Sequence, residues 1–273
     1  ERGPQYVHTF DKCFFMPSDL TAGLEYNRDR LKDNMWGYNR HTDQTVNIYS
    51  AFLQNEWKND RWGILIGGRL DKHNMVDNVI FSPRANLRFN PTQNINLRLS
   101  YSSGFRAPQA FDEDMHIENV GGTVAMIERA KDLKEEKSQS FSVSADMYHR
   151  FGAFQTNLLI EGFYTRLTDV FVLGKPYDRG DGILVKTRSN GPGAKVMGLT
   201  LEGKVAYLSI LQIQAGLTLQ RSRYDEPHKW HDDAPAEKKI FRTPDTYGYF
   251  TATYTPIKPL SIALSGTYTG RMI

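Results

Sequence analysis

The chain has 273 residues, with 34 Lys or Arg against 31 Asp or Glu, a formal net charge of +3 at pH 7. So small a charge gives no case for a nucleic-acid partner, and the lone cysteine, Cys13, excludes a disulfide framework or a cysteine-based metal site within the chain. No apolar run approaches the roughly 18 residues of a transmembrane helix, but transmembrane β-strands alternate and average out to polar.

Apolar and polar residues alternate along most of the chain, and helical periodicity is scarce. In "INLRLSYS" (95–102), for example, the odd positions are apolar or aromatic and the even positions are polar. The pattern predicts unusually long strands near 19–30, 44–58, 61–72, 81–89, 94–104, 138–150, 154–173, 183–208, 211–224, 244–255 and 260–272, with 5–15 as the end of one more.

The connections between these strands differ in length. Tight turns are expected at 59–60, 90–93, 151–153 and 256–259, and long loops at 31–43, 73–80, 105–137, 174–182 and 225–243. Short and long connections alternate if "SNGPGA" (189–194) is a bulge inside one strand over 183–208 and not a reversal, since glycines suit a bulge. The prediction is an antiparallel up-and-down meander with its tight turns at one end.

The polar faces of these strands carry charged residues such as Arg98, Glu202 and Lys204, so they require water, while the opposite faces are apolar. Lipid satisfies an apolar face without a second protein layer. The fold class predicted is therefore an all-β, antiparallel transmembrane β-barrel. The strand is then expected to leave the bilayer at "GFRAP" (104–108), and the long segment beyond it is expected to be an extracellular loop.

Three segments resemble TonB-dependent receptors, especially those of Bacteroidetes-type bacteria. They are "YSSGFRAPQAFDEDMHIENVGG" (101–122), "YSAFLQNEWKNDRWGILIGGRLDKH" (49–73) and "SNGPGAKVMGLTLEG" (189–203), the last departing from the family pattern by an inserted "PG" and by Thr200-Leu201 before the Glu. The resemblance implies a 22-stranded barrel filled by an N-terminal plug. Residues 1–273, with about 11–12 strands, are then expected to be a partial barrel domain: the second half, without the plug and the last strand.

The resemblance also implies a function. The protein is expected to be an outer-membrane receptor, not an enzyme, that takes up a scarce nutrient chelate of the ferric siderophore, cobalamin or haem class. Its implied partners are outer-membrane lipid, the TonB–ExbB–ExbD complex acting through the missing N-terminal part, and a surface lipoprotein. No resident cofactor or metal is implied, apart from a calcium ion considered for the extracellular loops.

Candidate ligand contacts lie on the predicted extracellular loops. The acidic stretch 111–118 is open to a calcium or substrate contact, since hard cations take oxygen ligands. The spacing of an EF-hand with its central Gly is absent, which favours a solvated acidic loop, or one salt-bridged to Arg106 and Arg129. In 228–233, the two histidines around Trp230 are open to a metal or substrate contact, but an ordinary loop is favoured. The segment 174–182 is predicted to be a glycine-rich hairpin tip, too irregular for a phosphate-binding loop. The candidates on these loops are Phe111, Asp112, Asp114, His116, Arg129, Tyr177, Arg179, Trp230 and His231, and Arg98, Glu202 and Lys204 are candidates facing the lumen.

Two other interpretations remain open from the sequence. A complete 12-stranded outer-membrane enzyme would fit the strand count, but no "G-x-S-x-G" elbow or other catalytic arrangement is found. A soluble β-rich binding domain would have to bury the apolar faces of nearly every strand against another layer.

Overall fold

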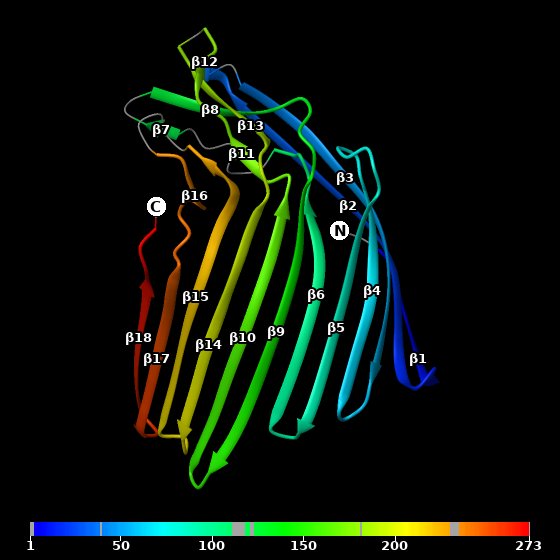
Figure 1. The fold of residues 1–273 in the computed structure, drawn as a ribbon, viewed down its shortest axis with the longest axis vertical. Helices are drawn as coiled ribbons and strands as arrows, with labels where there is room; N and C mark the ends of the chain where they lie inside the picture. The colour runs from blue at the N-terminus through cyan, green and yellow to red at the C-terminus, as the bar shows by residue number, and fades with distance from the viewer. Residues whose placement is uncertain are drawn as a thin grey trace.

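The computed structural model describes residues 3–38, 40–110, 118–120, 123–180, 182–229 and 235–272. Within them, most of the chain forms one antiparallel sheet whose twelve main strands pair in chain order (Figure 1). These strands are β1 (Gln5–Cys13), β2 (Met16–Met35), β3 (Arg40–Lys58), β4 (Trp62–His73), β5 (Ile80–Thr92), β6 (Ile95–Arg106), β9 (Glu136–Phe151), β10 (Phe154–Thr168), β14 (Ala194–Tyr207), β15 (Leu211–His228), β17 (Thr246–Ile257) and β18 (Leu260–Thr269). The short β16 (Glu237–Lys239) pairs with the end of β15. The all-β, up-and-down prediction is confirmed.

Alternation along the strands gives the main sheet one apolar face. Leu201 on β14 lies opposite Ile160 on β10 and Leu217 on β15, and both leucines are more than 40% exposed. At the tight-turn end of the same face, Trp62 stacks on Phe89 with ring centroids 4.2 Å apart. An apolar face with no protein layer against it, bordered by aromatic rings, is typical of a barrel wall in lipid.

Tight turns lie at one end of the main sheet, the bottom of Figure 1, and the longer connections at the other, as predicted. The predicted long loop over 31–43 is wrong. β2 and β3 continue as a paired ribbon joined by a single 3-10 turn, η1 (Trp36–Tyr38). Both faces of this ribbon are polar because both meet water, so the period-two signal that marks a half-buried strand is lost there. β15 likewise runs to His228, into the loop predicted over 225–243.

A second, five-stranded sheet lies at the long-loop end, at the top of Figure 1. It comprises β7 (Glu118–Val120), β8 (Thr123–Arg129), β11 (Phe171–Leu173), β12 (Tyr177–Asp178) and β13 (Leu184–Asn190). β13 and β8 come from two different connections and pair in parallel. The predicted strand over 154–173 therefore ends at Thr168, because the residues from Phe171 pair with β13 and not with the main sheet.

The predicted single bulged strand over 183–208 is also wrong. β13 belongs to the second sheet and β14 to the main sheet, with Gly191-Pro192-Gly193 between them. Asn190 holds this junction, since its Nδ2 donates to the carbonyls of Lys134 (3.0 Å) and Asp169 (2.9 Å). A Cβ at Gly193 would lie 2.8 Å from the Leu167 carbonyl oxygen, so the backbones approach too closely there for any side chain. The alternation of tight and long connections nevertheless holds.

The main sheet has two edges, β1 and β18, and the described residues show no pairing between them. A barrel closed by these twelve strands alone would need that pair, which counts against the interpretation as a complete 12-stranded enzyme. In the described part of the chain, no helix is long and apolar enough to cross a membrane.

Candidate functional site

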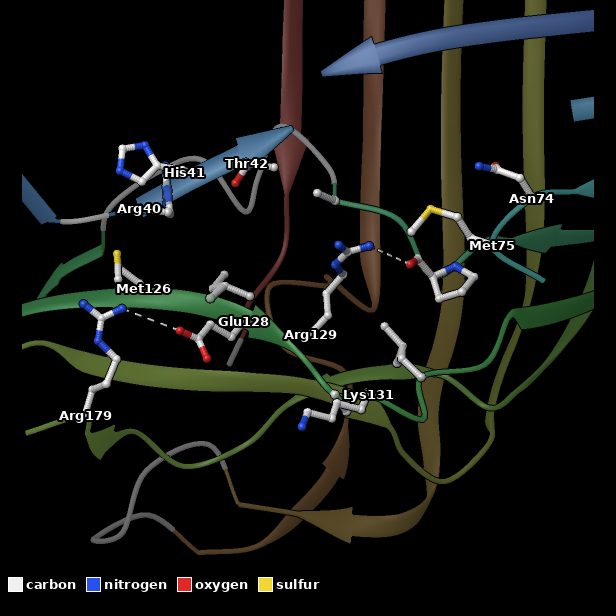
Figure 2. A pocket seen from close by; sticks show the side chains of 15 residues that line it. Arg40, His41, Thr42, Asn74, Met75, Met126, Glu128, Arg129, Lys131 and Arg179 are labelled. Atoms are coloured by element: carbon white, nitrogen blue, oxygen red, sulfur yellow. Dashed lines mark hydrogen bonds and ion pairs between the residues drawn. The ribbon is translucent and has the colours of Figure 1, made fainter. Parts of the chain in front are cut away.

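A pocket of about 780 Å³ lies at the long-loop end, between the start of β3 and the second sheet (Figure 2). β3 contributes its first residues, Arg40 to Thr42, β8 and the segment after it contribute 126–131, and Arg179 enters from the hairpin after β12. The remaining lining residues are Asn74, Met75, Pro108, Ala110 and Leu133. We call this cavity the rim pocket.

The rim pocket is basic. Its described lining includes the cations Arg40, Arg129, Lys131 and Arg179, and a single carboxylate, Glu128. Arg179 and Glu128 form an ion pair within the lining, with 3.7 Å between Nη1 and Oε1 (Figure 2). Glu128 pairs with Arg179, and Asp33, which lies outside the lining, pairs with Arg40. The four cations still outnumber these two carboxylates, and a concave site lined mainly by one sign of charge concentrates ligands of the other sign.

Gln44 on β3 connects the walls of the rim pocket. Its Oε1 accepts hydrogen bonds from Nη1 of Arg129 (2.9 Å) and from the backbone N–H of Ala110 (2.8 Å). Arg129 also donates to the carbonyl of Pro108, 2.9 Å away. The guanidinium of Arg129 is therefore held in one orientation by two elements far apart in sequence. Such fixation lowers the entropy that a bound ligand would have to remove.

The second sheet supports the pocket with a small apolar interior. Val185 on β13 lies directly opposite Met126 on β8, and their side chains are 0% and 1% exposed. Because Met126 itself lines the pocket, the position of Arg129 on the same strand depends on this packed pair.

Ion pairs fix the ribbon of β2 and β3 that forms the opposite wall. Nη2 of Arg40 lies 2.8 Å from Oδ2 of Asp33, and Arg30 donates to both carboxylate oxygens of Asp43, at 3.1 and 2.7 Å. The guanidinium of Arg30 holds the pKa of Asp43 below its usual value. Asp43 and Arg30 are about half exposed, so solvent screens this pair and it defines the strand register more than it adds stability.

Beside the pocket, His73 closes the junction between β4 and the segment after β6. The outward-facing residue next to it, Lys72, donates to the carbonyls of Val76 and Asp77, so the apolar band already ends before His73. The His73 side chain is 0% exposed. Its Nδ1 accepts from the Met75 backbone N–H at 3.0 Å, which leaves Nε2 to donate to Oε1 of Gln109 at 3.2 Å.

This burial makes the rim sensitive to pH. Burial lowers the pKa of His73, against smaller opposing effects of the Gln109 hydrogen bond and the Asp71 charge. The ordinary pKa of histidine is about 6.5, and a histidine with a lower pKa in the folded state binds more protons once its surroundings unfold. The packing around His73 is therefore fully stable above about pH 6.5 and weakens as the pH falls below that value. We expect faster hydrogen exchange of 107–110 at pH 5 than at pH 7.5, after correction for intrinsic rates, and no such difference in His73→Gln. An equal difference in both proteins would assign the effect to another group.

The structure describes some of the predicted loop contacts. Arg129 and Arg179, far apart in sequence, both line the rim pocket. Tyr177 lies on β12, outside that lining, and is 48% exposed. The candidates Phe111, Asp112, Asp114, His116, Trp230 and His231 lie outside the described residues, as does most of the acidic stretch considered for calcium. Within the described ranges, no three His, Cys, Asp or Glu side chains gather as a metal ion would require.

The three lumen candidates lie on the polar face of the main sheet. Arg98 donates from Nε to Oδ1 of Asn96 at 2.7 Å. Oε1 of Glu202 lies 3.4 Å from Nζ of Lys204 and accepts from Nε2 of Gln214 at 3.1 Å. A larger network stands on the same face of β2–β4, where Arg69 bridges Glu25 (2.6 Å) and Asp71 (2.8 Å).

Sequence reasoning missed Arg40, Glu128 and Lys131. Arg40 was hidden because 31–43 was assigned to a loop, although its alternating charges "RDRLKDNMWGYNRHTD" (28–43) fit two strands paired across a short turn. Glu128 and Lys131 flank the candidate Arg129, but nothing in the sequence indicates that β8 pairs with β13.

The fold and the rim pocket define a class: an outer-membrane β-barrel wall with a basic extracellular recess. The model of the family "TonB dependent receptor-like, beta-barrel" matches residues 4–272. The chain belongs to this family. Its strands form the wall of an outer-membrane β-barrel of this family, and the interpretation as a soluble β-rich domain is wrong.

Individual relatives agree on the fold. The siderophore receptor PirA of Pseudomonas aeruginosa superposes with a TM-score of 0.73 at 17% identity, over 97% of this chain and 48% of that one. The FrpB iron transporter of Neisseria meningitidis gives 0.65 at 15% identity, over 98% and 42%. The probable hemoglobin and hemoglobin-haptoglobin-binding protein 3 of Haemophilus influenzae is 23% identical over 206 residues, 74% of this chain and 18% of that protein. The chain thus spans about half the length of the solved structures. The narrower likeness to Bacteroidetes-type receptors stays a prediction.

Proposed function

We propose that this chain forms the ligand-capturing barrel wall of a receptor that takes up an anionic iron chelate. The observation that carries the proposal is the rim pocket, with four cations against one carboxylate in its described lining. Ferric siderophores of the catecholate type and haem both present negative oxygens on a large, partly apolar body. A pocket of about 780 Å³ falls in the size range of small-molecule sites.

The chemistry of the pocket favours some members of the predicted ligand class over others. Guanidinium groups donate paired hydrogen bonds to carboxylate or phenolate oxygens, which suits siderophores and haem better than cobalamin. The relatives named above are a siderophore receptor, an iron transporter and a probable hemoglobin-binding protein, and all three names concern iron sources. Uptake then requires binding and passage, not catalysis.

Membership of the family supports a proposal for the remaining partners. We propose that residues 1–273 are one partial barrel domain, completed in the membrane by further strands that pair with the exposed edges of β1 and β18. A plug would fill the lumen against the polar face that carries Arg98, Glu202 and Lys204. Energy would come from the TonB–ExbB–ExbD complex acting on that plug, and a surface lipoprotein is a further candidate partner.

Transport of radioactive iron tests this function. Cells carrying the whole receptor would be given a ferric catecholate with and without a proton uncoupler. We expect surface binding in both conditions, but accumulation only without the uncoupler, because only coupling to the proton gradient moves the plug. Accumulation that survives the uncoupler, or the absence of any binding to a panel of ferric catecholates and haem, would contradict the proposal.

A further inference from the structure

We infer that the outward face of β10, β14 and β15 holds an anionic lipid of the outer leaflet that carries more than one phosphate. The site has two parts, an apolar groove in the lipid-facing wall and a row of cations directly above it. It is separate from the rim pocket and does not depend on the proposed iron uptake, only on the place of the barrel in the outer membrane.

The cations stand in register across four neighbouring strands. Arg166 on β10 pairs with Lys195 on β14, Lys195 pairs with Arg223 on β15, and Arg223 pairs with Lys239 on β16. We call these four residues the cation row. Like charges directly opposite each other destabilise a sheet, so three such pairs side by side require negative charge from elsewhere.

Two carboxylates supply part of that charge. Asp225 lies 2.6 Å from Nη2 of Arg166 and 3.4 Å from Nζ of Lys195. Asp245 lies 2.8 Å from Nζ of Lys239 and 3.7 Å from Nη1 of Arg223. Each carboxylate thus serves two cations of the row. Two carboxylates against four cations leave two positive charges of the row that these ion pairs do not neutralise.

A fifth cation stands at the mouth of the groove. Arg221 is exposed and lies opposite Met197, one step below the cation row on the same outward face. Within the described part of the chain, its side chain makes no hydrogen bond or ion pair. Together with the row, Arg221 gives five cations against Asp225 and Asp245, an excess of three positive charges.

The groove itself is apolar and about 700 Å³ in volume. Outward residues on β6, β9, β10, β14 and β15 line it, among them Leu99, Val143, Leu199 and Leu219, with Arg221 also in the lining. Gly162 on β10 opens the middle, where every neighbouring outward position carries a larger side chain. Because the groove is part of the lipid-facing wall, a chain entering it comes from the bilayer.

The height of the cation row matches the headgroups. Lys195 and Tyr207, whose ring packs on Phe154 at the tight-turn end, are twelve residues apart on β14. Twelve residues span about 40 Å along a strand, or about 30 Å along the bilayer normal at the usual tilt. The row therefore lies at the far boundary of the hydrocarbon layer, where lipid phosphates lie, while the groove beneath it is at the depth of the acyl chains.

Retention of lipid by the whole receptor tests the site. Receptor purified from outer membranes would be delipidated, incubated in detergent with lipid A, phosphatidylethanolamine or inorganic phosphate, and examined by native mass spectrometry. We expect lipid A to bind at a stoichiometry of one to this face. Arg221→Gln, which removes the exposed charge, and Gly162→Leu, which fills the groove, should each lower its affinity about tenfold.

Matched variants separate the site from general effects. A Cβ at Gly162 would contact Val143 at an ordinary 3.6 Å, so leucine fits there, and Gly203 on β14 is an outward glycine in open space outside the groove. Gly203→Leu and Lys258→Gln, at the tight-turn end, should leave binding unchanged, and Arg221→Lys should retain most of it. Equal binding of lipid A by all variants, equal binding of phosphatidylethanolamine, or full competition by inorganic phosphate would overturn the inference.

Discussion

Replacing both Arg179 and Lys131 by glutamate is expected to lower the affinity of the whole receptor for an anionic ferric chelate by about 100-fold or more. Each reversed charge removes a charge-assisted contact worth about 1.4 kcal/mol or more, and each 1.4 kcal/mol is a factor of ten. These two residues are chosen because Arg129 also supports the local structure through Gln44 and Pro108. Reversing these two charges should change the electrostatic potential inside the rim pocket and leave its walls in place.

Titration of chelate fluorescence at several salt concentrations measures this effect. The affinity of the unaltered receptor should fall as ionic strength rises, because salt screens the attraction between the pocket cations and the chelate. The doubly reversed variant lacks the positive charges of Arg179 and Lys131, so its affinity should no longer fall with salt. The control reverses two exposed lysines at the opposite end of the barrel, Lys12 and Lys258. If the control weakens binding as much as the test pair, overall charge and not the rim pocket attracts the ligand.

Val185→Asp is expected to abolish high-affinity capture without disturbing the barrel. Val185 is fully buried against Met126 in the parallel pair of β13 and β8, so a carboxylate there must be desolvated, at a cost of about 3 kcal/mol or more. Among the side chains of the second sheet that the structure describes, few others are buried, so the sheet should open locally. The main sheet has its own hydrogen-bond ladder and does not depend on it.

Two measurements distinguish these outcomes. Migration of unheated samples on denaturing gels should stay that of a folded barrel, whereas chelate affinity should fall at least 100-fold. Val185→Ala, which only trims the side chain, should cost much less. A Val185→Asp receptor that still binds chelate with unaltered affinity would show that the second sheet does not position Arg129 and Arg179.

The sequence predicted the main sheet well because each strand there separates lipid from water. That boundary forces apolar and polar residues to alternate, and this alternation alone predicted strands such as β6 and β9. It fails where both faces of a strand meet the same solvent, as in the ribbon from Arg28 to Asp43. Pairing of β8 with β13 was equally hidden, because two short strands from different loops carry no local signal of their common sheet.

The candidate site was predictable only in part for the same reason. Arg129 and Arg179 were chosen as polar residues on long loops, and their shared pocket depends on the parallel pair. Arg40 needed the ribbon, and Lys131 needed the path of the chain after β8. Junction residues explain the other error: Asn190 and Gly193 look like a bulge in sequence, but their contacts with Asp169, Lys134 and Leu167 mark a change of sheet.

The most direct test of the account is a structure of the whole receptor with a ferric catecholate bound. The rim pocket predicts density for the chelate between the start of β3 and β8, with its phenolate oxygens within hydrogen-bonding distance of Arg40, Arg129 or Arg179. Density in that place would establish the pocket as the capture site. A chelate bound elsewhere, with the rim pocket empty and its cations turned to solvent, would contradict the account.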